Sequence, residues 1–261
     1  MENNNPWFIE GSSKARLVTV TPNGEEIIAY VARVTSKDQS NPNIKGLLKY
    51  CAKHGHWSVF EQADMTVEVI TPLAISVQAI RHKSFCLQQF SGRYENQELM
   101  AQHTEGLPAF QSICYMPEQA RLQDTKNRQN SIFADDASLT DYMWAEMEFA
   151  YKACLQSYRN LIDKGFAKEM ARFVLPQGVY TRLYMKGNVR SFFHYITVRD
   201  DEGVAQWEHC EVAKSIRKIF SEQFPTVYEA LCSDNHKDWE KENESLRMEI
   251  QILKAQLANR L

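Results

Sequence analysis

The order of hydrophobic and polar residues predicts alternating strands and helices in the first seventy positions. Residues 15–20 alternate between two faces and predict a strand, and the apolar-rich residues 25–34 predict a helix. Within 43–51 the apolar positions recur at helical spacing, and Gly55 stands where a helix often ends. Residues 65–69 alternate again, which indicates a half-buried strand.

A short helix is expected next, because residues 71–72, Thr-Pro, are typical of a helix start. Leu73, Val77 and Ile80 form its apolar stripe, and the pattern ends near His82. The residues that follow the helix are therefore expected to begin at its end, near His82, and to form a less regular segment.

The rest of the chain predicts further helices and one strand. Residues 95–137 are polar and predict a solvated loop or lid. The later elements are expected at 139–164 (a long helix closed by Gly165), 167–173 (helix), 179–185 (strand), 191–197 (helix) and 207–220 (helix). Together the elements predict an α+β fold, with a mixed or antiparallel sheet covered by helices.

The C-terminal residues 236–261 have a different period. Apolar residues recur every seven positions, with Trp239, Leu246 and Leu253 in one register and Asn243, Ile250 and Leu257 in the other. This pattern favours a short coiled coil; a single helix that packs its stripe on its own domain is the alternative. The expected organisation is an N-terminal arm (1–14), one domain (15–235) and the heptad helix (236–261).

Composition and charge narrow the function classes. The chain has 261 residues, 44% of them hydrophobic, so it can bury a substantial core. Its 30 basic and 33 acidic residues give a formal net charge of −3. There is no global positive field for a polymeric polyanion, so a small anionic ligand held by local arginines fits better than DNA.

The six cysteines lack the spacing of a metal site, and reduced thiols are expected. No apolar run is long enough to cross a bilayer, and the first residues lack the layout of a signal peptide. The sequence therefore predicts a cytoplasmic protein without a membrane partner.

The strongest chemical signal is a cluster of polar residues at 81–94. Arg81, His82 and Lys83 are followed after seven residues by 91–94, which read Ser-Gly-Arg-Tyr. Arginine binds phosphate in a bidentate manner, glycine lets the backbone approach a ligand, and serine both donates and accepts hydrogen bonds. The cluster suits an anionic, aromatic ligand, although many phosphate sites share these residue types.

This segment resembles the signature of the flavin-dependent thymidylate synthases, Arg-His-Arg followed by a short spacer and Ser-x-Arg-Tyr. Here Lys83 replaces the third arginine, Cys86 and Gln88 replace the usual Ser and Asn, and Gln89 stands where an acid is usual. Further segments resemble the family in the same order along the sequence: 32–34, 54–61, 169–176, 188–196 and 205–208. The resemblance therefore covers roughly residues 15–232. The run 121–131 also resembles a segment of some members, without an assigned role.

The resemblance implies a set of residues around deoxyuridine monophosphate (dUMP). Arg199 would meet the uracil ring and favour ionisation at N3, and Arg199 and Ser91 are the implied catalytic residues. The implied dUMP-binding residues are Gln78, Arg81, Gln89, Ser91, Gly92, Arg93, Arg172 and Arg199. None of the cysteines lies in the Pro-Cys-His setting of the folate-only thymidylate synthases, so polarisation by Arg199 is the preferred account.

The resemblance also implies a flavin site. The residues implied to bind FAD are Ser58, Arg81, His82, Lys83, Gln89, Asn188, Arg190 and His194. Lys83 keeps the charge of arginine but loses its planar grip. Val204 occupies the approximate place of a flavin-contacting histidine in some relatives, and His209 is left unassigned.

The implied reaction is reductive methylation of dUMP to dTMP. FAD takes a hydride from NADPH, 5,10-methylenetetrahydrofolate donates the carbon, and a final hydride transfer completes the methyl group. The family assembles as homotetramers, so the resemblance implies self-association.

Two other interpretations remain open. A nucleic-acid-binding protein would use 81–83 and 126–130, but the acidic balance speaks against it. A family member that has lost catalysis and serves in assembly is suggested by the changes at Lys83, Gln89 and Val204. Arg33 and Arg182 are expected to form ordinary surface ion pairs.

Overall fold

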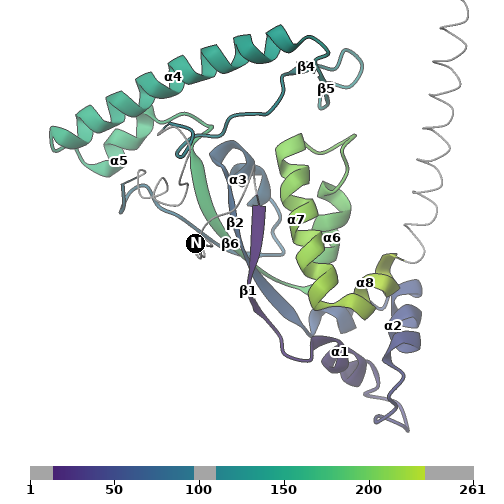
Figure 1. Ribbon diagram of the computed structural model, residues 1–261. Helices are drawn as coiled ribbons and strands as arrows, with labels where there is room; N and C mark the ends of the chain where they lie inside the picture. The colour runs from purple at the N-terminus through teal and green to yellow at the C-terminus, as the bar shows by residue number, and fades with distance from the viewer. Residues whose placement is uncertain (1–13, 97–109, 233–261) are drawn as a thin grey trace, which may run out of the picture. The chain divides into compact units, whose positions relative to one another are not determined.

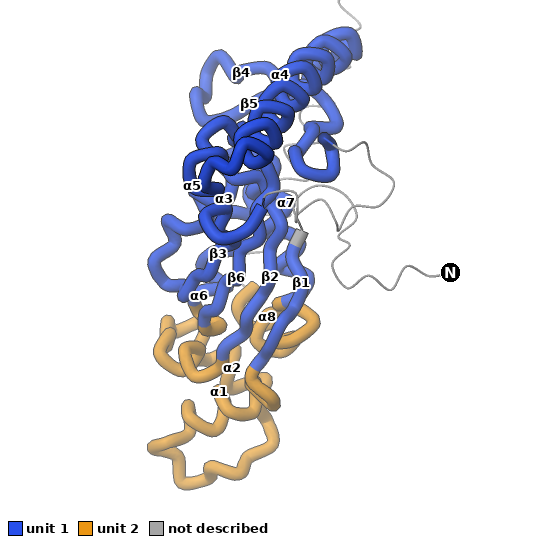
Figure 2. The backbone as a smooth tube through the Cα atoms, turned by 90° about the vertical axis from the view of Figure 1, so that its left-hand side faces the viewer, with its two compact units in different colours: residues 1–20, 64–187, 191–219 blue, residues 21–63, 188–190, 220–261 orange. Residues whose placement is uncertain are grey.

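The computed structural model describes residues 14–96 and 110–232. The heptad segment 236–261 and all but the last residue of the expected arm lie outside this range. The described residues form two compact units (Figure 2): unit 1 comprises residues 14–20, 64–96, 110–187 and 191–219, and unit 2 comprises residues 21–63, 188–190 and 220–232.

Unit 1 is built on a four-stranded sheet with the order β1-β2-β6-β3. β1 pairs with β2 and β3 pairs with β6, both antiparallel. The strands are β1 (Lys14–Val20), β2 (Asp64–Pro72), β3 (Cys86–Gln89) and β6 (Tyr180–Asn188). The predicted α+β class with an antiparallel sheet is confirmed.

Unit 1 also contains helices and a small hairpin. α6 and α7 run side by side (Figure 1) and meet where Tyr195 contacts His209. The helices are α3 (Leu73–Ala79), α4 (Ala137–Asp163), α5 (Lys168–Ala171), the 3-10 helix η3 (Arg172–Val174), α6 (Val189–Arg199) and α7 (Trp207–Gln223). The hairpin consists of β4 (Arg121–Gln123) and β5 (Ser131–Phe133).

Both faces of the strand β2 carry buried side chains. Met65, Val67 and Val69 on one face are buried, as their alternation predicted. Glu68, on the other face, is also fully buried, and its carboxylate forms ion pairs with Arg16 and Arg182. Arg182 is thus the partner of a buried carboxylate, and its expected role in a surface ion pair was wrong.

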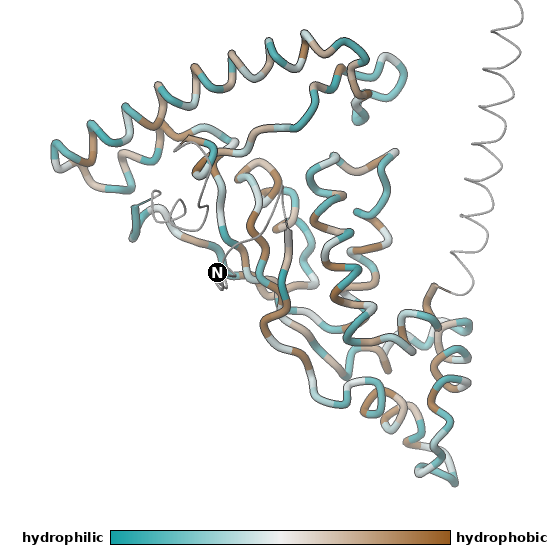
Figure 3. Tube along the Cα trace, in the orientation of Figure 1, coloured by the Kyte–Doolittle hydropathy of each residue, from teal (hydrophilic) through white to brown (hydrophobic). Residues whose placement is uncertain are grey.

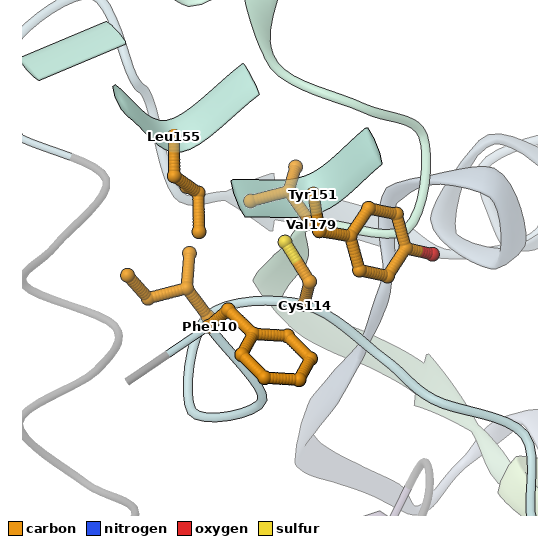
Figure 4. Packing of buried hydrophobic residues seen from close by; sticks show 6 residues of the cluster. Phe110, Cys114, Tyr151, Leu155 and Val179 are labelled. Atoms are coloured by element: carbon orange, nitrogen blue, oxygen red, sulfur yellow. The ribbon is translucent and has the colours of Figure 1, made fainter. Parts of the chain in front are cut away.

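The long helix α4 has its own hydrophobic cluster. Hydrophobic residues are interspersed with hydrophilic ones along it (Figure 3), and its Tyr151 and Leu155 pack against Phe110, Cys114 and Val179 (Figure 4). Burial raises the pKa of the Cys114 thiol to about 12. This cysteine therefore acts as a small hydrophobic residue in the core.

Unit 2 is helical. It contains α1 (Gly24–Ala32), α2 (Ile44–Lys53), the 3-10 helix η1 (Trp57–Glu61) and α8 (Pro225–Cys232). Asn43 caps α2 by accepting a hydrogen bond from the Gly46 amide at 3.1 Å, and Gly55 follows the helix with a positive φ of 66°. The start and end predicted for α2 are confirmed.

Other expectations differ from the structure. α3 buries Ile75, Ser76 and Ala79, whereas Val77 is 47% exposed, so the predicted stripe was wrong. Arg33 is buried and donates to the Asn43 carbonyl at 2.8 Å instead of forming a surface pair. The sequence also did not predict β3, the β4–β5 hairpin or α8.

Candidate active site

The signature segment joins α3 to β3. After α3 the chain turns, and the His82 amide donates to the Ala79 carbonyl at 3.1 Å. β3 then pairs with β6, and the Phe90 amide continues this pairing by donating to the Arg182 carbonyl at 2.8 Å. A helix end and a sheet edge thus fix both ends of the cluster; the turns at 80–85 match the less regular segment that was expected, whereas the strand β3 was not predicted.

Arg199 and His82 form the first contact of the site. The Arg199 Nε–H donates to His82 Nε2 at 2.9 Å. Burial, the Arg199 charge and the nearby His194 lower the pKa of His82 to about 4. His82 is therefore neutral at physiological pH, and its Nε2 acts as an acceptor.

A chain of side chains lies beside this pair. Gln78, on α3, donates from Nε2 to Gln206 Oε1 at 2.6 Å, and its Oε1 lies 3.3 Å from His209 Nδ1. His209 Nε2 lies 3.0 Å from the Tyr195 hydroxyl, and the Tyr195 ring meets His82 edge-on at 4.9 Å. Burial, then the charges of Arg199 and His82, lower the pKa of His209 to about 3.

The chain ends at the buried carboxylate of Glu208. Gln206 donates to its Oε2 at 3.0 Å, while Tyr115 at 3.1 Å and Arg121 donate to its Oε1. Burial alone would raise the pKa of Glu208, but the hydrogen bond and charge of Arg121 outweigh it and hold the pKa below its usual value. Glu208 is therefore an anion that accepts hydrogen bonds only.

A turn after β3 carries Ser91, Gly92 and Arg93. The Arg93 amide lies 3.4 Å from Ser91 Oγ, and the Arg93 guanidinium pairs with Glu169 at 2.8 Å. Both partners of this ion pair are largely exposed, so it is weak. A phosphate group can replace Glu169 as the partner of Arg93.

Gln89 and Arg172 have different surroundings. Gln89 donates from Nε2 to Ser76 at 3.0 Å and to Thr181 at 3.2 Å, so this nitrogen bonds within the fold. Arg172 is exposed at the start of η3. Within residues 14–96 and 110–232, no side-chain bond connects Arg172 to another predicted site residue.

The residues implied for FAD fall into both units. In unit 1, Arg81, Lys83 and His194 are exposed. In unit 2, Ser58 is exposed on η1, Asn188 is half-buried at the end of β6, and Arg190 pairs with Glu61 at 2.5 Å. Cations, an amide and a hydroxyl are donors that suit the pyrophosphate and ring of FAD, so the chemistry of this set fits the group.

Six residues of the hydrogen-bonded network around Glu208 and His209 had no role in the sequence-based site: Tyr115, Arg121, Tyr195, Gln206, Glu208 and His209. A solvated loop was expected at 95–137, but Arg121 begins a strand of the β4–β5 hairpin and is half-buried. Val204, which the resemblance puts at the approximate place of a flavin-contacting histidine in some relatives, is 59% exposed. The likeness of 205–208 to the family was the available signal, but it did not identify partners.

A pocket of about 390 Å³ lies beside this network. Arg121 and Phe133 of the hairpin line it together with Gln206 and Trp207 at the start of α7. The rings of Phe133 and Trp207 meet edge-on at 5.0 Å. In the described part of the chain, no cluster of residues suits a metal ion and no helix is both long and apolar enough to cross a membrane.

Comparison with known proteins places the chain among enzymes of thymidylate synthesis. The sequence model of the family described as thymidylate synthase complementing protein matches residues 16–226. A flavin-dependent thymidylate synthase of Synechocystis is 45% identical over 79% of this chain and 89% of its own length. A probable flavin-dependent thymidylate synthase of Paramecium bursaria Chlorella virus 1 is 41% identical over 83% and 98%, respectively.

The chain therefore belongs to the flavin-dependent thymidylate synthase family. Its fold is also that of a solved protein, the UMP/dUMP methylase PolB of Streptomyces cacaoi bound with 5-Br dUMP. The TM-score is 0.71, with 23% identity over 87% of this chain and 97% of that one. The protein is thus an enzyme of the methyltransferase class that uses a flavin.

Proposed function

We propose that the protein converts dUMP to dTMP by reductive methylation, with 5,10-methylenetetrahydrofolate as the carbon donor and FAD reduced by NADPH as the hydride carrier. Family membership supports the methylation and the flavin. The choice of FAD, NADPH and folate rests on the resemblance in the signature segment. The 5-Br dUMP in the structurally similar Streptomyces methylase is consistent with a pyrimidine nucleotide as the substrate.

The observation that carries the proposal is the contact between Arg199 and neutral His82. The contact uses Nε of Arg199, which leaves the terminal guanidinium nitrogens as donors for a ligand. In the described residues Arg199 has no carboxylate partner within ion-pair distance. Its charge is therefore available to stabilise a uracil ring that becomes anionic at N3.

The phosphate of dUMP is assigned to cations and donors of the signature segment 81–94 and to Arg172. Arg81, Ser91, Gly92, Arg93 and Arg172 would supply guanidinium groups, a hydroxyl and backbone amides. A charge-assisted hydrogen bond contributes about 1.5–3 kcal/mol. Ser91 has the further role of a polar contact close to the reacting ring.

Binding of FAD is assigned to the cationic and amide donors named above. Arg81 and Lys83 would hold phosphate oxygens, and Asn188 and Arg190 would donate to the cofactor. When bound, the flavin supplies the hydride chemistry of the reaction. Lys83 offers a point charge where the family has a planar fork, so it is expected to orient the cofactor less strictly.

Self-association as a homotetramer is part of the proposal and rests on the resemblance. Removal of residues 233–261 should weaken assembly more than it alters the isolated fold. Sedimentation of the full chain and of the truncated chain measures this directly. Unchanged sedimentation would mean that the segment has no role in assembly.

Anaerobic synthesis of dTMP tests the reaction. The purified protein receives dUMP, methylenetetrahydrofolate and NADPH, with FAD either omitted or added, and product that depends on FAD is expected. Arg199→Ala should lower kcat about 100-fold or more, as expected when a donor to developing negative charge is removed. Arg128→Ala, an exposed arginine in the hairpin turn, is the matched control. A folded protein that binds dUMP but forms no product would overturn the proposal.

A further inference from the structure

Five side chains form one continuous chain of hydrogen bonds. It runs from Tyr195 on α6 through His209, Gln78 and Gln206 to the carboxylate of Glu208. The four separations are 3.0, 3.3, 2.6 and 3.0 Å, respectively. Tyr195, His209 and Glu208 are buried, so water does not readily replace the bonds at the two ends of the chain, whereas Gln206 in its middle is exposed.

The chemistry of Glu208 sets the direction of every bond. An ionised carboxylate only accepts, so Gln206 must turn its NH₂ group toward Glu208. The carbonyl of Gln206 then faces Gln78, which must therefore donate from its own NH₂ group. The carbonyl of Gln78 in turn faces His209, whose Nδ1 must carry a proton.

The hydrogen bond between Tyr195 and His209, at the end of the chain farthest from Glu208, has the same direction. His209 that is protonated on Nδ1 and neutral accepts at Nε2, so the Tyr195 hydroxyl donates to it. Burial raises the pKa of Tyr195, which keeps the phenol protonated. All bonds consequently point from Tyr195 toward the negative charge of Glu208.

Arg121 and Tyr115 hold that charge in place from the other side. Both donate to Oε1 of Glu208, which leaves Oε2 to accept from Gln206. The two oxygens therefore have separate partners. An anchor on the hairpin strand β4 is thereby connected to a side chain on α3.

We propose that Glu208 is a positioning residue that fixes, through Gln206, the orientation of the Gln78 carboxamide and the tautomer of His209. The consequence for dUMP rests on the proposed function, in which Gln78 contacts the nucleotide. A fixed carboxamide offers the ligand one donor and one acceptor in known places. A carboxamide free to rotate by 180° would exchange them, and only part of the molecules would bind correctly.

The tautomer of His209 is the most direct test. ¹⁵N-histidine NMR of the full-length protein with FAD at pH 7 distinguishes the protonated ring nitrogen from the unprotonated one. Loss of a signal in His209→Asn assigns the resonances. We expect a neutral ring with its proton on Nδ1; a proton on Nε2 would overturn the proposal without reference to any other variant.

Glu208→Gln tests the role of the charge. Arg121 and Tyr115 should hold the carbonyl oxygen of the new amide in the place of Oε1, so its NH₂ group faces Gln206 and the direction of the chain reverses. The proton of His209 should then shift toward Nε2, and the Kd for dUMP should rise about tenfold, equivalent to about 1.4 kcal/mol. Glu211→Gln is the matched control, because Glu211 is on the same helix but pairs with Lys214; neither value should change there.

Gln206→Met provides a second route if Glu208→Gln does not fold. It breaks the chain of hydrogen bonds next to Glu208 and leaves the contact between Arg121 and the carboxylate intact. The Gln78 carboxamide loses its partner, so His209 should populate both tautomers and dUMP should bind more weakly. An unchanged tautomer and unchanged Kd in either folded variant would overturn the proposal.

These measurements are independent of turnover. If the protein forms no dTMP but its His209 tautomer and dUMP affinity respond as expected, the proposed reaction fails and the role of Glu208 stands. If dTMP forms and Glu208→Gln changes neither quantity, the proposed reaction stands and the role of Glu208 fails.

Discussion

Glu68 and Glu208 are two buried carboxylates of unit 1 with different surroundings. Glu68 lies in the sheet and pairs with Arg16 and Arg182, so two positive charges face one negative charge. Glu208 lies at the start of α7 and has Arg121 as its cation. Both also accept from a tyrosine hydroxyl.

The difference lies in what each carboxylate is connected to. The partners of Glu68 in the described structure are strand residues that join β1, β2 and β6. Glu208 accepts a further bond from Gln206, which continues to Gln78 and His209. A buried charge can thus serve mainly to join strands or serve to orient other side chains, and burial alone does not distinguish the two roles.

Removal of Glu68 should have the largest effect. Glu68→Ala leaves two guanidinium groups without their shared carboxylate, and breaking a buried ion pair costs about 3–5 kcal/mol. Urea unfolding measures the change in the free energy of unfolding. Glu148→Ala, which removes an exposed partner of Lys152, should leave this free energy nearly unchanged. Similar small losses in both variants would refute the structural role of Glu68.

Removal of the cation next to Glu208 should have a smaller effect that depends on pH. Arg121→Met should cost about 2 kcal/mol at pH 7, because it removes a hydrogen bond to a charged group. In the native protein the pKa of Glu208 is lowered from 4.5, so its contribution is present above pH 4.5 and is lost as the pH falls.

The variant should show the opposite sign. Without Arg121, burial dominates and raises the pKa of Glu208 above 4.5, so the contribution of this group is lost as the pH rises. The difference in stability between the native protein and Arg121→Met should therefore widen from pH 4 to pH 7. Urea unfolding across this range checks it, and a constant difference would contradict it.

Local signals made parts of the fold predictable. The alternation of Met65, Val67 and Val69 indicated β2, and Asn43 and Gly55 marked the ends of α2. β3 was missed because its four residues include two glutamines and it exists through pairing with β6. The hairpin likewise depends on pairing between two strands of three residues each.

The site was predictable only where the family resemblance reached. Arg199 and His82 are 117 positions apart, and no periodicity connects them. Arg121 lies 87 positions from Glu208, in a segment whose polar composition indicated a loop. A buried carboxylate can be recognised only when the fold shows which distant donors meet it.

The pH dependence of stability should reveal that two histidines are neutral in the folded protein. Both lie near the end of the hydrogen-bond chain that is farthest from Glu208. The pKa values of His82 and His209 are lowered from 6.5 to about 4 and about 3. Their contribution is present above pH 6.5 and is lost as the pH falls from there toward these values, because the unfolded chain binds protons that the folded chain does not. His209→Asn should reduce this proton uptake on unfolding by about one proton, measured from the slope of stability against pH. An unchanged slope would mean that His209 is charged in the folded protein.

The smallest effect is expected for dUMP binding when Glu68 loses its charge, because nucleotide binding is where the roles of Glu68 and Glu208 differ most. Glu68→Gln should lower stability yet leave the Kd for dUMP within about twofold of the native value, because Glu68 has no bond to Gln78 or His209 in the described structure. Calorimetric titration with dUMP, at a temperature where the variant is fully folded, measures it. A tenfold loss of affinity would show that the sheet transmits the state of Glu68 to the turn at Phe90, which bonds to the Arg182 carbonyl at 2.8 Å. The contrast between a carboxylate that joins strands and one that orients a site would then fail, since both would act on the nucleotide.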